Sequence, residues 1–197
     1  MTPWWQGADE ALFRILHLEW RHPFLDPVFR ALTDPGKLAI PLILVLLGFL
    51  WIERRRGLVA LLVLAATITV ADQMSASVLK PLFARPRPWV AIPEARPFFG
   101  ERGSYSFPSV HATNAFAAAM VLDVVFPGAR VAFFALAALV GYSRIYVGDH
   151  YPSDVLAGAL LGAAIGWGGR KLFQFLAARW PRASGLRRAG EKPSAAP

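Results

Sequence analysis

The chain of 197 residues contains no cysteine and has few charged side chains. The absence of cysteine excludes a disulfide framework, a thiolate zinc site and a cysteine nucleophile. Charged residues make up 17% of the sequence and hydrophobic residues 55%, whereas about a quarter of a soluble domain is usually charged. Aromatic and aliphatic residues are abundant, which excludes intrinsic disorder for most of the chain. The composition therefore indicates a membrane protein.

Apolar runs separated by charges or prolines predict five membrane spans, with six as the alternative. A helix needs roughly 20 residues to cross the bilayer core. The runs that approach this length are residues 38–52, 57–79, 109–126, 131–143 and 153–169. Several are short, so tilt or snorkelling of flanking lysine and arginine side chains must supply the missing length. We expect an all-α fold, a polytopic membrane helical bundle.

The segments on either side of this bundle have a different character. Residues 1–36 are too polar to span a membrane and lack the pattern of a signal peptide. Apolar residues recur there at helical spacing from Leu12 to Trp20, so we expect an amphipathic helix at 8–20 that lies at the membrane interface. A second interfacial turn is expected at 26–33. Residues 37–180 then form the transmembrane domain, and residues 181–197 a flexible basic tail.

Glycines at spacing four mark the last predicted span. Gly158, Gly162 and Gly166 fall on one helical face, where a neighbouring backbone can approach closely. We interpret them as residues of helix packing.

The positive charge of the chain bears on its orientation. The formal net charge of +8 suits membranes and phosphorylated substrates as well as nucleic acid. If five spans alternate, the two sides carry 11 and 10 of the 21 Lys and Arg residues. Lys80, Arg87 and Arg144 are candidate site residues on the second side, and setting them aside leaves an excess on the first. We therefore expect the first side, with Arg54–Arg56 and the carboxyl terminus, to be cytoplasmic.

Side chains suited to phosphate chemistry gather at helix ends on the second side. They are Lys80 and Arg87 around a proline-rich segment, Ser109 and His111 at the start of the third span, Arg144 at the end of the fourth, and His150 and Asp154 at the start of the fifth. Lysine and arginine neutralise phosphate oxygens, and the free N–H groups that begin a helix bind anions. Pro152 suits the first turn of a helix, so the Asp154 carboxylate can hold one nitrogen of His150 while the other attacks. His111 can protonate the leaving oxygen.

Each of these parts alone has a commoner structural explanation. An Arg-Pro-Arg-Pro run often anchors a chain at a membrane surface, a His-x3-Asp pair is often a surface hydrogen bond, and Ser109 can serve only as a helix N-cap. For the carboxylates inside predicted spans, we expect at most a supporting role for Asp72 and an interfacial one for Asp123. The combination, in order and on one face, is what indicates a phosphate site.

The combined pattern resembles the signature of a known superfamily. Lys80-x6-Arg87-Pro88, Pro108-Ser109-x-His111 and Ser143-Arg144-x5-His150-x3-Asp154 are similar to the motifs of the type 2 phosphatidic acid phosphatase (PAP2) superfamily, which includes vanadium haloperoxidases and glucose-6-phosphatase. The resemblance covers residues 80–154, and the flanking spans resemble those of short bacterial members.

This resemblance assigns roles to the residues. It implies a metal-independent phosphatase without a cofactor, in which His150 is the nucleophile and forms a phosphohistidine, Asp154 orients it and His111 is the general acid. The residues that would hold the phosphate are Lys80, Arg87, Ser109, Arg144 and the backbone amide of Val110. The family usually has glycine where this chain has Val110, whose side chain keeps the N–H but crowds the approach of the phosphate.

The expected function is that of a lipid phosphate or diphosphate phosphatase at the outer face of a bacterial-type inner membrane. Undecaprenyl diphosphate is the leading substrate, because short bacterial relatives are often of that type. Phosphatidylglycerophosphate, phosphatidic acid and lipid A 1-phosphate are the alternatives. A non-catalytic lipid-binding scaffold is the rival from another class, and only Val110 favours it. A haloperoxidase is disfavoured by the five spans, and no nucleic acid partner is expected.

Overall fold

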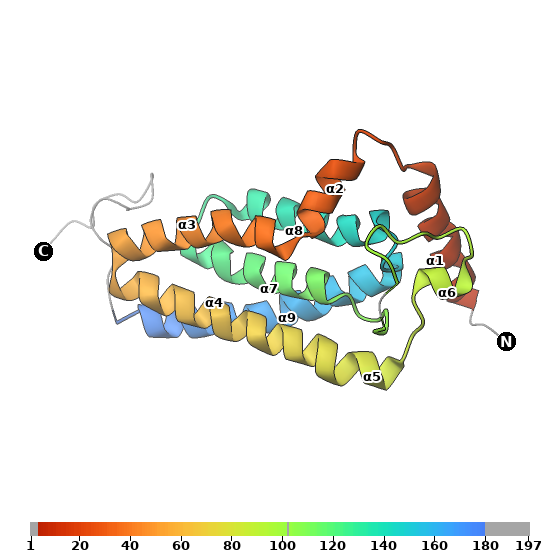
Figure 1. Ribbon diagram of the computed structural model, residues 1–197. Helices are drawn as coiled ribbons and strands as arrows, with labels where there is room; N and C mark the ends of the chain where they lie inside the picture. The colour runs from red at the N-terminus through yellow and green to blue at the C-terminus, as the bar shows by residue number, and fades with distance from the viewer. Residues whose placement is uncertain (1–3, 102, 180–197) are drawn as a thin grey trace, which may run out of the picture.

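The computed structural model describes residues 4–101 and 103–179, and every regular element within these ranges is helical. The long helices are α3 (Pro35–Glu53), α4 (Arg55–Gln73), α7 (Val110–Val125), α8 (Arg130–Tyr146) and α9 (Pro152–Ala177). They run alongside one another as a bundle (Figure 1). Each coincides with one of the apolar runs, so the predicted all-α fold is confirmed. The predicted tail, residues 181–197, lies outside the described residues.

The number of membrane spans is a separate question from the number of helices. Among the described residues, one helical stretch, Arg55–Ala91, is long and apolar enough by length and composition to cross a membrane. It comprises α4, the π-helical segment Met74–Leu79, α5 (Lys80–Phe83) and α6 (Pro88–Ala91). Helix α7 is apolar but shorter. Five spans therefore stay a prediction, which the exposed large apolar side chains of α4, α8 and α9 favour.

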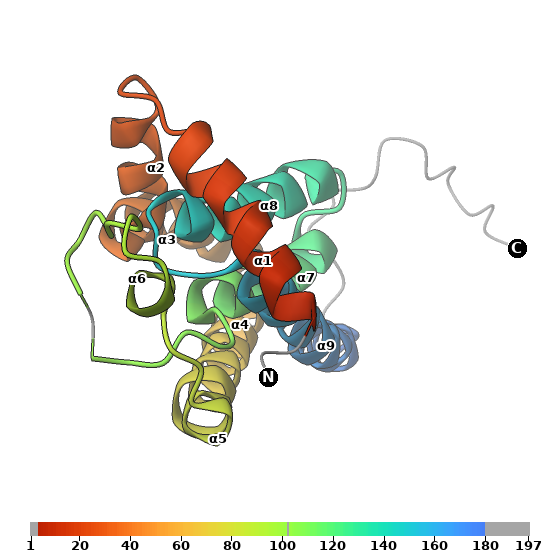
Figure 2. The ribbon, with the colours of Figure 1, turned by 90° about the vertical axis from the view of Figure 1, so that its right-hand side faces the viewer.

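Helix α7 lies at the centre of the bundle and contacts α4, α8 and α9 (Figure 2). The α9 glycines make the closest of these contacts possible. A Cβ atom added at Gly158 would lie 2.6 Å from the carbonyl oxygen of Ser109, and one added at Gly166 would lie 2.6 Å from that of Ala117. The predicted role of these glycines in helix packing is thus confirmed. The contact places the start of α9 beside the start of α7.

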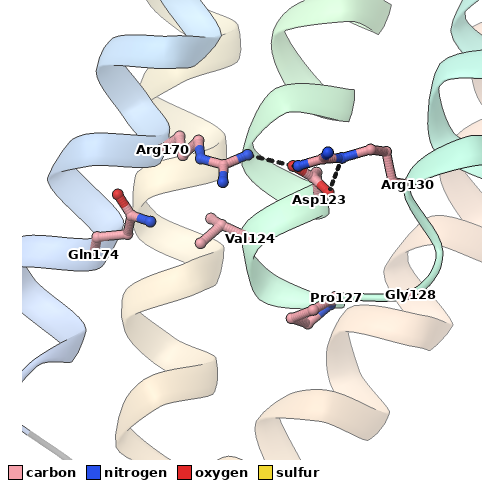
Figure 3. Close-up of a pocket in the computed structure, with 7 residues that line it drawn as sticks. All are labelled: Asp123, Val124, Pro127, Gly128, Arg130, Arg170 and Gln174. Atoms are coloured by element: carbon pink, nitrogen blue, oxygen red, sulfur yellow. Dashed lines mark hydrogen bonds and ion pairs between the residues drawn. The ribbon is translucent and has the colours of Figure 1, made fainter. Parts of the chain in front are cut away.

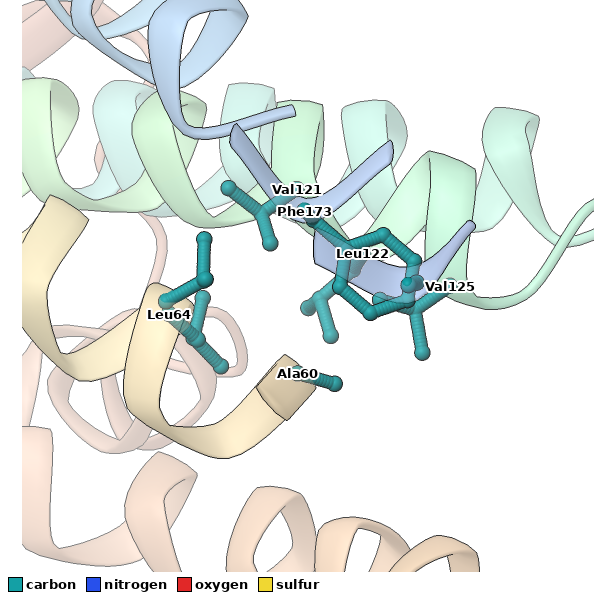
Figure 4. Packing of buried hydrophobic residues seen from close by; sticks show 8 residues of the cluster. Ala60, Leu64, Val121, Leu122, Val125 and Phe173 are labelled. Atoms are coloured by element: carbon teal, nitrogen blue, oxygen red, sulfur yellow. The ribbon is translucent and has the colours of Figure 1, made fainter. Parts of the chain in front are cut away.

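A hydrophobic cluster joins the other ends of the same helices. Leu64 of α4, Leu122 of α7 and Phe173 of α9 meet there with smaller apolar residues (Figure 4). Between helices predicted to span a membrane, such a cluster stabilises the bundle through close van der Waals packing, because the surrounding lipid is equally apolar. This cluster packs one end of the bundle, and many buried polar residues gather at the opposite, polar end, where α7 and α9 begin.

The N-terminal segment covers that polar end. Helix α1 (Trp4–Arg14), continued by a π-helical turn (Ile15–Glu19), crosses the end of the bundle, and α2 (Asp26–Thr33) follows it (Figure 2). The predicted helices at 8–20 and 26–33 are therefore present.

The buried face of the N-terminal helix differs from the predicted one. Leu12 and Trp20 are 45% and 57% exposed, whereas Asp9, Phe13 and His17 are buried. These three residues are four apart and so share one helical face. One face of the helix thus packs against the rest of the protein. The exposed apolar residues Leu12 and Trp20 remain available to contact the membrane interface.

Substituting the central α9 glycine tests the packing of α7 and α9. A Cβ at Gly162 would collide with the backbone of Thr113, whereas at Gly168 of the same helix no described atom lies within 4 Å. We expect Gly162→Ala to lower the free energy of unfolding by about 1–3 kcal/mol. Gly168→Ala is the matched control, and alanine's helix propensity favours it by up to about 1 kcal/mol. Thermal unfolding of both variants in one detergent measures the difference, and equal midpoints would contradict the packing argument.

Candidate active site

The predicted site residues occupy the end of the bundle where α7 and α9 begin and α8 ends (Figure 1). Ser109 occupies the N-cap position of α7 without a capping hydrogen bond from its side chain, and His111 is the second residue of that helix. Arg144 lies in the last turn of α8, His150 in the loop that follows, and Asp154 in the first turn of α9. Lys80 and Arg87 approach this end from the segment around α5 and α6. Elements far apart in the sequence thus meet at one place.

His150 and Asp154 form a buried pair. Helix α9 begins at Pro152, as predicted, so His150 precedes the helix and Asp154 follows one turn later. The His150 Nδ1 atom lies 3.6 Å from Asp154 Oδ2 and makes no hydrogen bond within the described part of the chain. Burial lowers the pKa of the His150 imidazole to about 4, although the Asp154 carboxylate acts to raise it. The imidazole is therefore neutral near pH 7, the state that a nucleophile requires.

The Asp154 carboxylate is held from several sides. Its Oδ1 accepts a hydrogen bond from Arg85 Nη1 at 2.6 Å, while its Oδ2 accepts from the Tyr151 amide at 2.9 Å and from the Ser106 hydroxyl. The sequence motifs pointed to Arg87 and not to Arg85, yet Arg85 is the arginine that contacts Asp154. The motif marks Arg87 alone, and no spacing in the sequence pairs Arg85 with Asp154.

Arg87 and Arg144 both bind Asp149, the residue before His150. Arg87 Nη1 donates to the Asp149 carbonyl at 2.9 Å, and its other nitrogens bind Ser104 at 2.8 Å. Arg144 donates to the Asp149 carboxylate and, at 2.8 Å, to the Thr33 hydroxyl. Asp149 is fully buried, so it holds two predicted phosphate-binding cations close to His150. Sequence reasoning missed Asp149, because adjacency to His150 was its one distinguishing signal.

Ser109 offers an unused donor to the same place. Its hydroxyl is fully buried and makes no hydrogen bond to any described residue. Leaving such a group unpaired costs about 1–3 kcal/mol, so the hydroxyl is suited to a ligand oxygen. The Ser109 amide is used internally, since it donates to the Asp154 carbonyl at 3.0 Å. The start of α7 is thereby tied to the first turn of α9.

The other predicted site residues are Lys80, Val110 and His111. Lys80 is buried, and its ammonium group donates to the carbonyl oxygens of Tyr105 and Ser106. Val110 is the first residue of α7 and is not among the residues with positive φ, so its β-branched side chain causes no backbone strain there. His111 is partly exposed beside it.

The two carboxylates inside predicted spans lie away from these contacts. Asp72 accepts a hydrogen bond from Asn114 at 3.0 Å, which joins α4 to α7. Asp123, near the far end of α7, binds Arg130 through two hydrogen bonds of 2.9 Å and also Arg170 (Figure 3). These residues line a polar pocket together with Gln174. Because the pocket lies at the opposite end of α7 from His111, it is separate from the candidate active site.

Comparison with known proteins identifies the family. Residues 56–178 match the PAP2 superfamily. The chain belongs to this superfamily. A lipid A 4'-phosphatase of Bacteroides thetaiotaomicron is 37% identical over 171 residues, which are 79% of this chain and 71% of that protein. The resemblance inferred from the sequence motifs is thus confirmed.

Two solved structures share the fold. The transmembrane PAP2 type phosphatidylglycerolphosphate phosphatase from Bacillus subtilis has a TM-score of 0.67 and 28% identity, over 92% of this chain and 90% of its own. LpxE from Aquifex aeolicus has a TM-score of 0.65 and 29% identity, over 82% of this chain and 93% of its own. The PAP2 chain described here is therefore a membrane protein and a phosphatase, and the predicted metal-independent class goes with this membership.

Two substitutions test the roles predicted for the buried pair. His150→Ala removes the nucleophile and should abolish turnover, because no other group replaces a covalent nucleophile. Asp154→Asn should slow phosphoenzyme formation by roughly 10³–10⁴-fold, since the orienting negative charge is lost. Rapid-quench measurement of the phosphoenzyme with an aryl phosphate gives both results.

Asp34→Asn is the matched control for the second substitution. Asp34 caps α3 by accepting from the Gly36 amide at 3.0 Å, and asparagine caps a helix equally well. Near-normal turnover in His150→Ala would show that the assigned nucleophile is wrong.

Proposed function

We propose that this PAP2 chain hydrolyses the phosphate ester or diphosphate of a membrane lipid through a phosphohistidine on His150. The observation that carries the proposal is the buried His150 beside Asp154, with Arg87 and Arg144 gathered at the preceding residue. A neutral nucleophile surrounded by cations suits an anionic phosphoryl group. The unpartnered Ser109 hydroxyl supports the same conclusion.

The reaction has two steps. The free nitrogen of His150 attacks phosphorus, and the bond from phosphorus to the leaving oxygen breaks while His111 gives that oxygen a proton. Water then attacks the phosphohistidine, His111 takes up its proton, and inorganic phosphate leaves with His150 restored. Positive charge that develops on the imidazole in the first step is stabilised by Asp154. Lys80, Arg87, Arg144, the Ser109 hydroxyl and the Val110 amide hold the phosphoryl oxygens.

The substrate class follows from the relatives and from the surface near the site. Relatives of this chain are named for lipid A and phosphatidylglycerophosphate. Aromatic and apolar side chains beside the site, Phe83, Phe99 and Tyr105, are about half exposed and suit the depth of lipid headgroups. We propose a phosphomonoester of the lipid A class as the leading substrate, with phosphatidylglycerophosphate next. Undecaprenyl diphosphate, which the sequence favoured, stays a prediction.

A panel of lipid phosphates tests this function directly. Purified protein in detergent is given lipid A, phosphatidylglycerophosphate, phosphatidic acid and undecaprenyl diphosphate, and phosphate release is measured with and without EDTA. We expect release that EDTA does not reduce, because a phosphohistidine mechanism needs no metal, and we expect none from His150→Ala.

Different failures of the panel have different meanings. Loss of release in EDTA that Mg²⁺ or Zn²⁺ restores would contradict the metal-independent mechanism. No release from any lipid would favour a non-catalytic lipid-binding scaffold. Release confined to undecaprenyl diphosphate would replace lipid A by the substrate that the sequence favoured.

We also propose that the site lies at the outer face of the inner membrane. Because the native chain has no cysteine, single cysteines can report the topology. Arg54 and Glu94 lie in exposed positions, one before α4 and one after α6. We expect Glu94→Cys to react with an impermeant thiol reagent in intact cells and Arg54→Cys to react after permeabilisation only. The reverse pattern would invert the orientation.

A further inference from the structure

Asp9 belongs to none of the sequence motifs, yet it contacts the site. It lies in α1 and is 7% exposed. Its Oδ2 accepts hydrogen bonds from Arg85 Nη2 at 2.6 Å and from the Ser153 hydroxyl at 2.5 Å, and its Oδ1 accepts from the Ser153 amide at 2.9 Å. One of these donors is Arg85, which also binds Asp154. The other two are the amide and the hydroxyl of Ser153, the residue before Asp154.

Arg85 bridges Asp9 and Asp154. Its Nη1 donates to Asp154 Oδ1 at 2.6 Å and to the Ser153 hydroxyl at 2.8 Å, while its Nη2 binds Asp9. The guanidinium also lies 4.0 Å from the centre of the Tyr151 ring. Contacts at both ends and on one face fix the planar group in a single orientation.

The charges of this bridge suit the proposed chemistry. A buried Asp154 without a cation would carry a large desolvation penalty, which Arg85 offsets. If Arg85 acted alone, it would cancel the negative charge that stabilises an imidazole becoming positive during attack. With Asp9 present, the group Asp9, Arg85 and Asp154 keeps one net negative charge beside His150.

Other contacts hold α1 in place independently of Asp9. The Phe13 ring packs 5.7 Å from that of Tyr151, and His17 Nδ1 lies 2.7 Å from the Tyr146 carbonyl oxygen. Gly148 has φ +85°, and a Cβ there would lie 2.9 Å from the His17 ring. The buried face of α1 thus covers the loop that carries His150, so removing the Asp9 charge should leave the helix docked.

We propose that Asp9 and Arg85 are positioning residues that fix Asp154 and preserve the negative charge beside His150, which makes α1 part of the catalytic apparatus. This inference rests on the proposed roles of His150 and Asp154. Neither residue touches the phosphate, so their substitution should change the chemical step more than substrate binding.

Charge removal at Asp9 is the first test. In Asp9→Asn we expect phosphohistidine formation to slow by about 10–100-fold, the scale of a misplaced catalytic group, with KM within about twofold. Asp9→Glu should recover part of the rate because it restores the charge. The control is Glu94→Gln, which removes the 3.1 Å ion pair with Arg14 of the same helix at an exposed place. It should keep the normal rate.

Chemical rescue at Arg85 is the second test. Arg85→Ala should form phosphohistidine more slowly than Asp9→Asn, and added guanidinium ion should restore part of the rate. Rescue of the rate without a change in the thermal unfolding midpoint separates a positioning role from a purely structural one. This measurement also decides the matter if Asp9→Asn folds poorly in detergent.

The outcomes separate this inference from the proposed function. An Asp9→Asn rate equal to that of Glu94→Gln would overturn it, as would an Arg85→Ala protein that guanidinium does not rescue. If the unsubstituted chain formed no phosphohistidine at all, the proposed function would fall first and the positioning roles with it.

Discussion

The fully buried Asp154 carboxylate is the constraint on which this end of the molecule depends. A buried charge costs several kcal/mol unless cations and hydrogen-bond donors surround it. Here Arg85, Ser106 and the Tyr151 amide supply them, and each comes from a different segment of the chain. One carboxylate thereby fixes the relative positions of three segments around His150. The same buried carboxylate thus positions the loop that carries His150 and stabilises the polar end of the bundle.

The glycine contact between α7 and α9 makes that arrangement possible. With hydrogen in place of a side chain at Gly158, the backbone of Ser109 can approach α9 closely enough for its amide to bind the Asp154 carbonyl at 3.0 Å. The end of α7 that would receive the phosphate is therefore positioned by the helix that carries the orienting carboxylate. A side chain on that face of α9 would separate the two helices and, with them, the two halves of the site.

Local signals made much of the fold predictable, and non-local contacts account for what was missed. Apolar runs and prolines are read within a few residues, so the bundle helices and the start of α9 at Pro152 were expected. The pairing of Arg85 with Asp9, by contrast, joins residues 76 apart, and no spacing rule indicates it. The buried face of α1 and of the π-helical turn that continues it was missed for another reason. Two of its members, Asp9 and His17, are polar, and a search for apolar periodicity passes over them.

The two ends of α7 show how the same chemistry serves structure in one place and catalysis in the other. At the far end Asp123 binds Arg130 and Arg170, so both carboxylate oxygens are occupied by arginine. That group is complete by itself and clamps three helices together. Near the predicted phosphate site, the Ser109 hydroxyl is buried without a hydrogen bond to any described residue. Unsatisfied groups are costly, and a fold retains them where a ligand or a reaction uses them. The incomplete hydrogen bonding at this end, more than its charge, is what distinguishes a site from a clamp.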